Sequence, residues 1–231
     1  MEPIHKAATH RLVVDRLRRA IHLGEYLPGD RLPAERDIAE QLGVSRETLR
    51  EALRTLEDEG YVTSRRGPGG GHTVTELVEP KRRTLERLKV DRESLVHLME
   101  FRRVNECLAA RLAAQRRSGQ DLARMAIAVE DLMQAEDIQK FRRADAAFHL
   151  AVAVASRNPF VEKAVVDARE RIFLLHGGLD YKLVLQTTLD SHRFIFDAIR
   201  DKDPDRAESE MAKHMAVALD EIQNVLLGDA A

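Results

Sequence analysis

The chain has little cysteine and few aromatic residues, and both shortages limit what it can be. Cys107 is the only cysteine among 231 residues, which excludes an internal disulfide and a CxxC metal site. Tryptophan is absent, and aromatic residues make up 4% of the chain. The dominant Leu, Ala, Glu and Arg favour helix over sheet. A single free thiol fits a reducing cytoplasm.

Long apolar runs and an excess of positive charge are also missing. No stretch approaches the roughly 20 apolar residues that cross a bilayer, and the N-terminal residues lack the apolar core of a signal peptide. We therefore expect a cytoplasmic protein without membrane contact. The net charge is −2, and residues 1–75 contain 12 basic and 12 acidic residues. Charge alone therefore does not indicate a nucleic-acid partner.

A helix-turn-helix is predicted near the N-terminus. Apolar residues at helical spacing indicate a helix over 9–23 and a short one over about 34–41. Gly43 breaks the short helix, and Ser45 is placed to cap the next one, which ends at Gly60. Two short helices around a tight glycine-containing turn are the sequence form of this motif.

A β-hairpin is predicted directly after the motif, in the place of a wing. Two β-rich stretches, about 61–66 and 72–76, flank the sequence GPGGG. Arginines at the start of a recognition helix can bind guanine edges, and wing residues can approach phosphate. The predicted DNA contacts are Arg36, Ser45, Arg46, Thr48, Arg50, Arg66 and Gly67.

The remainder of the chain is predicted to be helical. Breaks at glycine, proline and capping residues give helices over about 92–117, 119–135, 137–156, 158–176, 181–201 and 204–227. The polar, charged segment before them is the expected linker. The predicted organisation is a DNA-binding domain at 1–78, a linker at 79–91 and an all-helical sensing domain at 92–231.

Three of these helices carry polar residues inside their apolar stripes. His192 and His214 each interrupt such a stripe, and Asp145 and His149 share one helix face at i,i+4 spacing. Burying four such groups without partners is costly. They therefore either bond to one another or bind a metal. Three imidazoles and one carboxylate suit a divalent ion such as Zn, Ni or Mn.

Both halves of the chain resemble known families. LPAERDIAEQLGVSRETLREALRTLEDEGYV is similar to the winged-helix domain of the GntR family of bacterial regulators, over residues 10–75. EFRRVNECLAARLAA, DAAFHLAVAVASRNP, SHRFIFDAIRDKD and MAKHM resemble the FCD effector domain of the FadR subgroup, over residues 92–227. The resemblance implies a mainly α fold, with an N-terminal winged helix-turn-helix, a small β-hairpin and a C-terminal helical bundle.

The resemblance also implies a function. It makes Asp145, His149, His192 and His214 the ligands of a metal, and it places Arg102 against a small carboxylate effector. We expect a homodimeric repressor that binds a palindromic double-stranded DNA operator and is released by the effector, and not an enzyme. Two alternatives stay open: a metal-dependent enzyme acting on a small carboxylate, and a regulator with a metal-free structural core.

Overall fold

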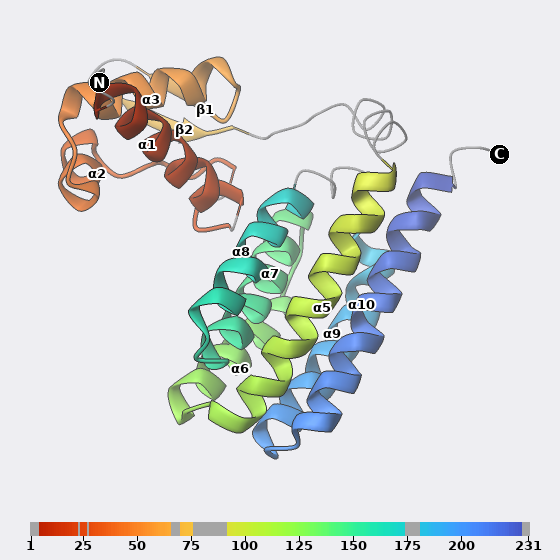
Figure 1. Cartoon of the computed structure of the whole chain (residues 1–231). Helices are drawn as coiled ribbons and strands as arrows, with labels where there is room; N and C mark the ends of the chain where they lie inside the picture. Colours follow the sequence, from red (N-terminus) through yellow and green to blue (C-terminus); the bar gives the residue numbers. More distant parts are fainter. Residues whose placement is uncertain are drawn as a thin grey trace. The chain divides into compact units, whose positions relative to one another are not determined.

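The computed structural model describes residues 5–22, 24–26, 28–65, 70–75, 92–173 and 181–227. The chain divides into two compact units, residues 1–78 and 79–231 (Figure 1). The linker predicted at 79–91 lies outside the described residues. None of the helices in the described ranges has the length and apolar content needed to cross a bilayer.

The first unit packs three helices with a two-stranded hairpin. Its helices are α1 (His5–His22), α2 (Glu35–Leu42) and α3 (Arg46–Asp58), and its antiparallel strands are β1 (Val62–Arg65) and β2 (Gly71–Val74). A bridge between Arg31 and Thr73 ties the segment before α2 to the hairpin. All five elements contribute apolar side chains to one core, which includes Val13, Leu17, Ile38, Leu49, Leu53, Leu56, Val62 and Val74.

The turn between α2 and α3 forms for local reasons. Gly43 ends α2 with a φ of 65°, in the left-handed region that favours glycine. Ser45 precedes α3, and its side-chain oxygen accepts a hydrogen bond from the backbone N–H of Thr48 at 3.1 Å. This bond satisfies one of the free N–H groups that every helix start presents. The cap fixes where the predicted recognition helix begins.

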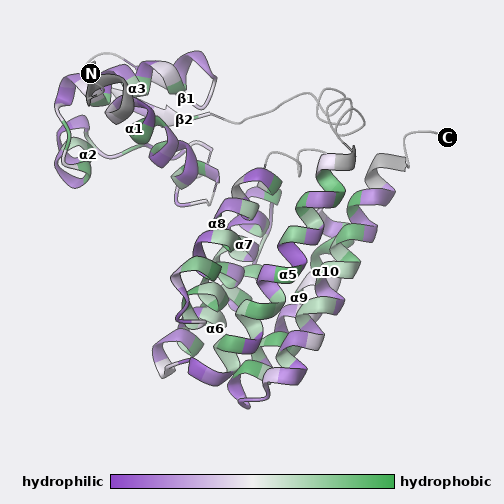
Figure 2. Ribbon diagram, viewed as in Figure 1, coloured by the Kyte–Doolittle hydropathy of each residue, from purple (hydrophilic) through white to green (hydrophobic). Residues whose placement is uncertain are grey.

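The second unit is an all-helical bundle. Its helices are α5 (Arg92–Arg116), α6 (Gly119–Met133), α7 (Ile138–Ala155), α8 (Pro159–Phe173), α9 (Tyr181–Arg200) and α10 (Pro204–Leu227). Figure 2 shows hydrophobic residues gathered where these helices face one another. Phe148, Met125, Ile195 and Ile199 are fully buried there, among many alanines that let the helices approach closely.

Polar residues cap several helices of the bundle. Ser118 and Asp121 form a capping box at the start of α6, and Asp137 caps α7. The carboxylate of Asp203 accepts a hydrogen bond from the backbone N–H of Arg206 at 3.0 Å, as expected for an Asp-Pro helix start. These local signals place the helix ends within a few residues of the predicted ones.

The elements confirm the predicted fold class. The chain is mainly α, with a helix-turn-helix and small hairpin in its first unit and helices alone in the described part of its second. The strands β1 and β2 lie close to the predicted stretches at 61–66 and 72–76. The predicted wing residues Arg66 and Gly67 lie outside the described residues.

The stability of the first unit is expected to fall in mild acid because of His22. Burial lowers the pKa of His22 from 6.5 to about 4, and the charge of Arg18 adds to the effect. Its Nε2 lies 3.0 Å from the hydroxyl of Tyr61. The unfolded chain binds the proton near pH 6.5 and the folded one only near pH 4, so stability present at neutral pH is lost as pH falls between these values.

An NMR titration of the imidazole resonances tests this expectation. The His22 ring is expected to titrate near pH 4, and thermal unfolding of the His22→Gln variant is expected to depend less on pH between 7 and 5 than that of the wild type. Replacement of the exposed His97 by Gln is the matched control. A His22 midpoint near 6.5 would contradict the burial argument.

Candidate metal centre and DNA-contact surface

The start of α3 lies beside a hollow lined by arginines. Arg31, Arg36 and Arg46 line it together with Gly70 and Gly71. All three arginines are exposed, and the Arg36 side chain keeps 78% of its surface open. Three guanidinium groups around one hollow suit phosphate oxygens. Arg36 and Arg46 were predicted from the sequence as DNA contacts, whereas Arg31 was not, because it reaches this place through the bridge to β2.

The other predicted DNA contacts lie nearby with partners of their own. Arg50 donates a hydrogen bond from Nε to Glu35 at 2.7 Å. Burial favours a higher pKa for Glu35, but the hydrogen bond and charge of Arg50 outweigh it, and the pKa is lowered. Thr48 is buried, and its hydroxyl lies 2.8 Å from that of Ser45. Ser45 and Thr48 thus serve the helix start, and their contact with DNA stays a prediction.

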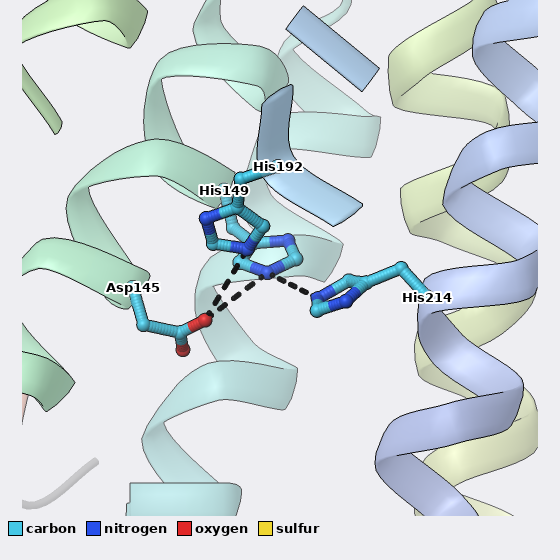
Figure 3. Close-up of side chains that lie close together, drawn as sticks. All are labelled: Asp145, His149, His192 and His214. Atoms are coloured by element: carbon cyan, nitrogen blue, oxygen red, sulfur yellow. Dashed lines mark hydrogen bonds and ion pairs between the residues drawn. The ribbon is translucent and has the colours of Figure 1, made fainter. Parts of the chain in front are cut away.

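The four predicted metal ligands meet in the interior of the second unit. Asp145 and His149 come from α7, His192 from α9 and His214 from α10, and their side chains converge on one point (Figure 3). Nε2 of His149 lies 3.2 Å from Nε2 of His214. Oδ1 of Asp145 lies 3.5 Å from Nε2 of both His149 and His192. One ligand atom from each residue lies within 4.8 Å of all the others.

Unsatisfied nitrogen atoms mark this cluster as a candidate site. His192 is fully buried, and neither of its ring nitrogens has a hydrogen-bond partner in the described part of the chain. An unpaired buried polar group costs about 1–3 kcal/mol. Burial, followed by the facing histidines, lowers the pKa of His192 well below 6.5, and burial with His149 lowers that of His214 to about 3. Both imidazoles are therefore neutral at pH 7, the form that binds metal.

The spacing of the ligand atoms also fits a metal. Two donors at about 2.0–2.1 Å from a tetrahedral ion lie about 3.3 Å apart. The three distances of 3.2, 3.5 and 3.5 Å match neighbouring positions in such a sphere. The cluster thus has the donor types of a divalent-ion site, and three of its donor pairs have the separations of one.

A buried ion-pair network surrounds the candidate ligands. Glu106 on α5 contacts Nδ1 of His149, and it accepts a hydrogen bond from Nε of Arg102 at 2.5 Å. Burial opposes the charge of Glu106, but Arg102 and His149 outweigh it and hold its pKa far below the usual range. With Nδ1 of His149 facing a carboxylate, its Nε2 is free to face the cluster centre.

Asp145 has a comparable partner in Arg169 of α8. The Arg169 guanidinium donates to Asp145, and both side chains are largely buried. Burial raises the pKa of Asp145, but Arg169 and then His149 overcome this and hold it well below 3.8. Glu106 was not among the site residues predicted from the sequence. The i,i+4 spacing of Arg102 and Glu106 was the available signal.

A pocket opens beside the cluster. Asp145, His214 and Arg102 lie in its wall, and its other lining residues are Phe141, Val184, Thr187, Thr188, Val217, Ala218, Glu221 and Ile222. Burial and the charge of Asp145 raise the pKa of Glu221 to about 7. The pocket therefore has a cationic side chain and candidate metal ligands in one part and a carboxyl group in another.

Comparisons with known proteins agree with this architecture. Residues 9–71 match the family model for bacterial regulatory proteins of the gntR family, and residues 97–217 match the FCD domain. The Exu regulon transcriptional regulator of Escherichia coli K12 is 32% identical over 86% of this chain and 78% of its own length. The galactonate operon transcriptional repressor of the same strain is 28% identical, over 87% and 90%.

A solved structure shares the fold. A putative transcriptional regulator GntR from Rhodococcus sp. RHA1 superposes with a TM-score of 0.54 at 24% identity, covering 94% of this chain and 98% of its own. These relatives are transcriptional regulators and not enzymes. The chain therefore belongs to the GntR family of bacterial transcriptional regulators, in the FadR-type subgroup that carries an FCD effector domain.

Proposed function

We propose that this regulator is a repressor whose hold on DNA is released by a small carboxylate bound at a metal site in its second unit. The observation that carries the proposal is the convergence of Asp145, His149, His192 and His214 with the unpaired nitrogens of His192. The name of one relative connects it with an operon for galactonate, which is a carboxylate. That relative's description as a repressor supports the proposed sign of regulation.

Asp145, His149, His192 and His214 would hold the metal, with Glu106 fixing the ring of His149. Nitrogen and carboxylate donors suit Zn, Ni or Mn. The ion would supply a positive centre that attracts a carboxylate oxygen. Arg102 lines the same pocket, and a guanidinium beside a cation makes an anion site. The positive charges of the ion and of Arg102 are the reason for proposing a carboxylate as the effector.

The first unit would bind the operator. We propose that two copies act as a homodimer in the cytoplasm, each placing the start of α3 in the major groove of one half of a palindromic site. Arg36 and Arg46 would contact DNA beside Arg31. The effector would act by binding one arrangement of the dimer better than another.

DNA binding is expected to weaken strongly in the Arg46→Ala variant. An arginine that bonds a guanine edge is worth about 1–3 kcal/mol, which corresponds to about 5- to 150-fold in affinity. Fluorescence anisotropy at fixed salt, with DNA from upstream of the gene and with scrambled DNA, measures the loss. Arg143→Ala, an exposed position in the second unit, makes the same change in net charge. Equal binding by the Arg46 and Arg143 variants would remove Arg46 from the reading surface.

The proposed release of DNA by the effector is tested by the same fluorescence anisotropy assay. Protein loaded with Zn is expected to lose affinity for its operator when millimolar small carboxylates are added, and chelator-treated protein is expected to respond much less. Metal analysis of untagged protein gives the occupancy directly. Protein that binds no metal, before or after addition of Zn, Ni or Mn, would instead support a metal-free structural core.

A further inference from the structure

The pocket beside the cluster has a second polar end. Glu221 lies on α10 seven residues beyond His214, which is two helical turns or about 10.5 Å along the axis. It is half-buried, and no hydrogen bond or ion pair joins it to another described residue. A carboxyl group that faces a pocket without a protein partner is available to a ligand.

Residues of α9, the helix that packs against α10, line the same pocket. α9 and α10 are joined by the short turn at 201–203 and run antiparallel, and the rings of His192 and His214 lie beside each other, with centroids 4.9 Å apart. Steps of four residues away from the turn, starting from this pair, lead to Thr188 and Ala218 and then to Val184 and Ile222. Because Val184, Thr188, Ala218 and Ile222 all line the pocket, it extends from the histidine level to the level of Glu221.

The charges differ between the two ends. Arg102 lies near His214, whose pKa its charge helps to lower, whereas the charge of Asp145 raises the pKa of Glu221. The histidine end therefore favours an anion, and the Glu221 end favours a hydrogen-bond donor. A carboxylate at the Glu221 end would meet a like charge in a partly desolvated place.

We propose that Glu221 is a specificity residue, and that the effector is a linear carboxylate carrying a hydroxyl or ammonium donor at the end remote from its carboxylate. The inference rests on the proposed function, because the carboxylate is received by the metal and Arg102. The axial separation of about 10.5 Å between the Cα levels of His214 and Glu221 sets the order of the effector's length, a chain of a few carbons.

A matched series of five-carbon acids tests the proposal on the full chain loaded with Zn. Pentanoate, 5-hydroxypentanoate, 5-aminopentanoate and glutarate differ only in the terminal group. Calorimetric titration at pH 8 is expected to show that at least one donor-terminated acid binds about tenfold more tightly than pentanoate. Glutarate is expected to bind more weakly than pentanoate. The affinities of 5-hydroxypentanoate and 5-aminopentanoate show whether the preferred donor is a hydroxyl or an ammonium group.

Substitution of Glu221 gives the decisive comparison. Glu221→Gln is expected to reduce the preference for 5-aminopentanoate and to raise the affinity for glutarate, because the amide can donate to a carboxylate. Asp220→Asn, an exposed neighbour on α10, is expected to change neither ratio. Equal binding of all four acids, or ratios unchanged by Glu221→Gln, would overturn the inference.

The same experiments distinguish a failure of the proposed function from a failure of the role proposed for Glu221. Titration of the protein with Zn alone is carried out first, and absence of metal binding would overturn the metal site together with this inference. Metal binding followed by pentanoate binding without a terminal preference would overturn the role of Glu221 alone. Metal binding with no response to any of the four acids would also count against the proposed ligand class.

Discussion

Addition of one equivalent of Zn to chelator-treated protein is expected to raise its melting temperature by about 10 °C. A ligand at a thousand times its Kd stabilises the folded state by about 4 kcal/mol. For a unit of this size, each kcal/mol shifts the melting temperature by about 2–4 °C. The large effect is expected because the four candidate ligand groups already lie together, with His192 neutral and Asp145 ionised at pH 7.

The His192→Gln variant separates metal binding from packing. Gln exchanges one buried polar side chain without hydrogen-bond partners for another, so the metal-free variant is expected to unfold near the wild-type temperature, while the Zn-dependent rise is lost. His97→Gln on α5 is the matched exposed control. Differential scanning fluorimetry and metal analysis of the same samples provide both readouts. A full Zn-dependent rise in the His192 variant would rule out the proposed ligand set.

Glu106→Gln is expected to destabilise the second unit by about 3–5 kcal/mol. Arg102 and His149 would then lie beside a neutral amide, and a buried charge that loses its partner costs about this much. Since Glu106 also orients the imidazole of His149, the affinity for Zn is expected to fall about 10- to 100-fold. Urea unfolding and Zn titration measure the two effects.

The matched control for this substitution is Glu100→Gln, an exposed position on the same helix. A second variant, Arg102→Met with Glu106→Leu, removes both charges. It is expected to regain much of the stability lost in Glu106→Gln while responding weakly to carboxylates, because replacing both partners leaves no uncompensated charge. Retention of wild-type stability and Zn affinity by Glu106→Gln would show that the network has no role in holding His149.

The histidine cluster could be predicted from the sequence because its signal is local. His192 and His214 interrupt apolar stripes of period 3.6, and Asp145 with His149 stand one turn apart. Helix ends were predictable for the same reason, since glycine, proline and capping residues act within a few positions. Periodicity says which face is buried, and four polar groups on buried faces point to a shared partner.

The network around the cluster was less accessible to sequence reasoning. Arg102 and Glu106 have the spacing of an ordinary surface ion pair, and only the packing of α5 with α7 buries them against His149. In the sequence Glu221 resembles a solvent-facing residue, and only the packing of α9 against α10 places it in the wall of a pocket. Arg31 gains its position from a bridge to β2. In each case the decisive neighbour is distant in sequence.

The three helices that supply the ligands have a mechanical consequence. An ion held by α7, α9 and α10 would tie together residues 145 to 214, closing a long loop of chain. Constraints of this kind stabilise a fold chiefly by restricting its unfolded ensemble. In a chain whose one cysteine, Cys107, precludes a disulfide, the metal would be a reversible cross-link. The rigidity of the bundle would then follow the free metal concentration of the cell.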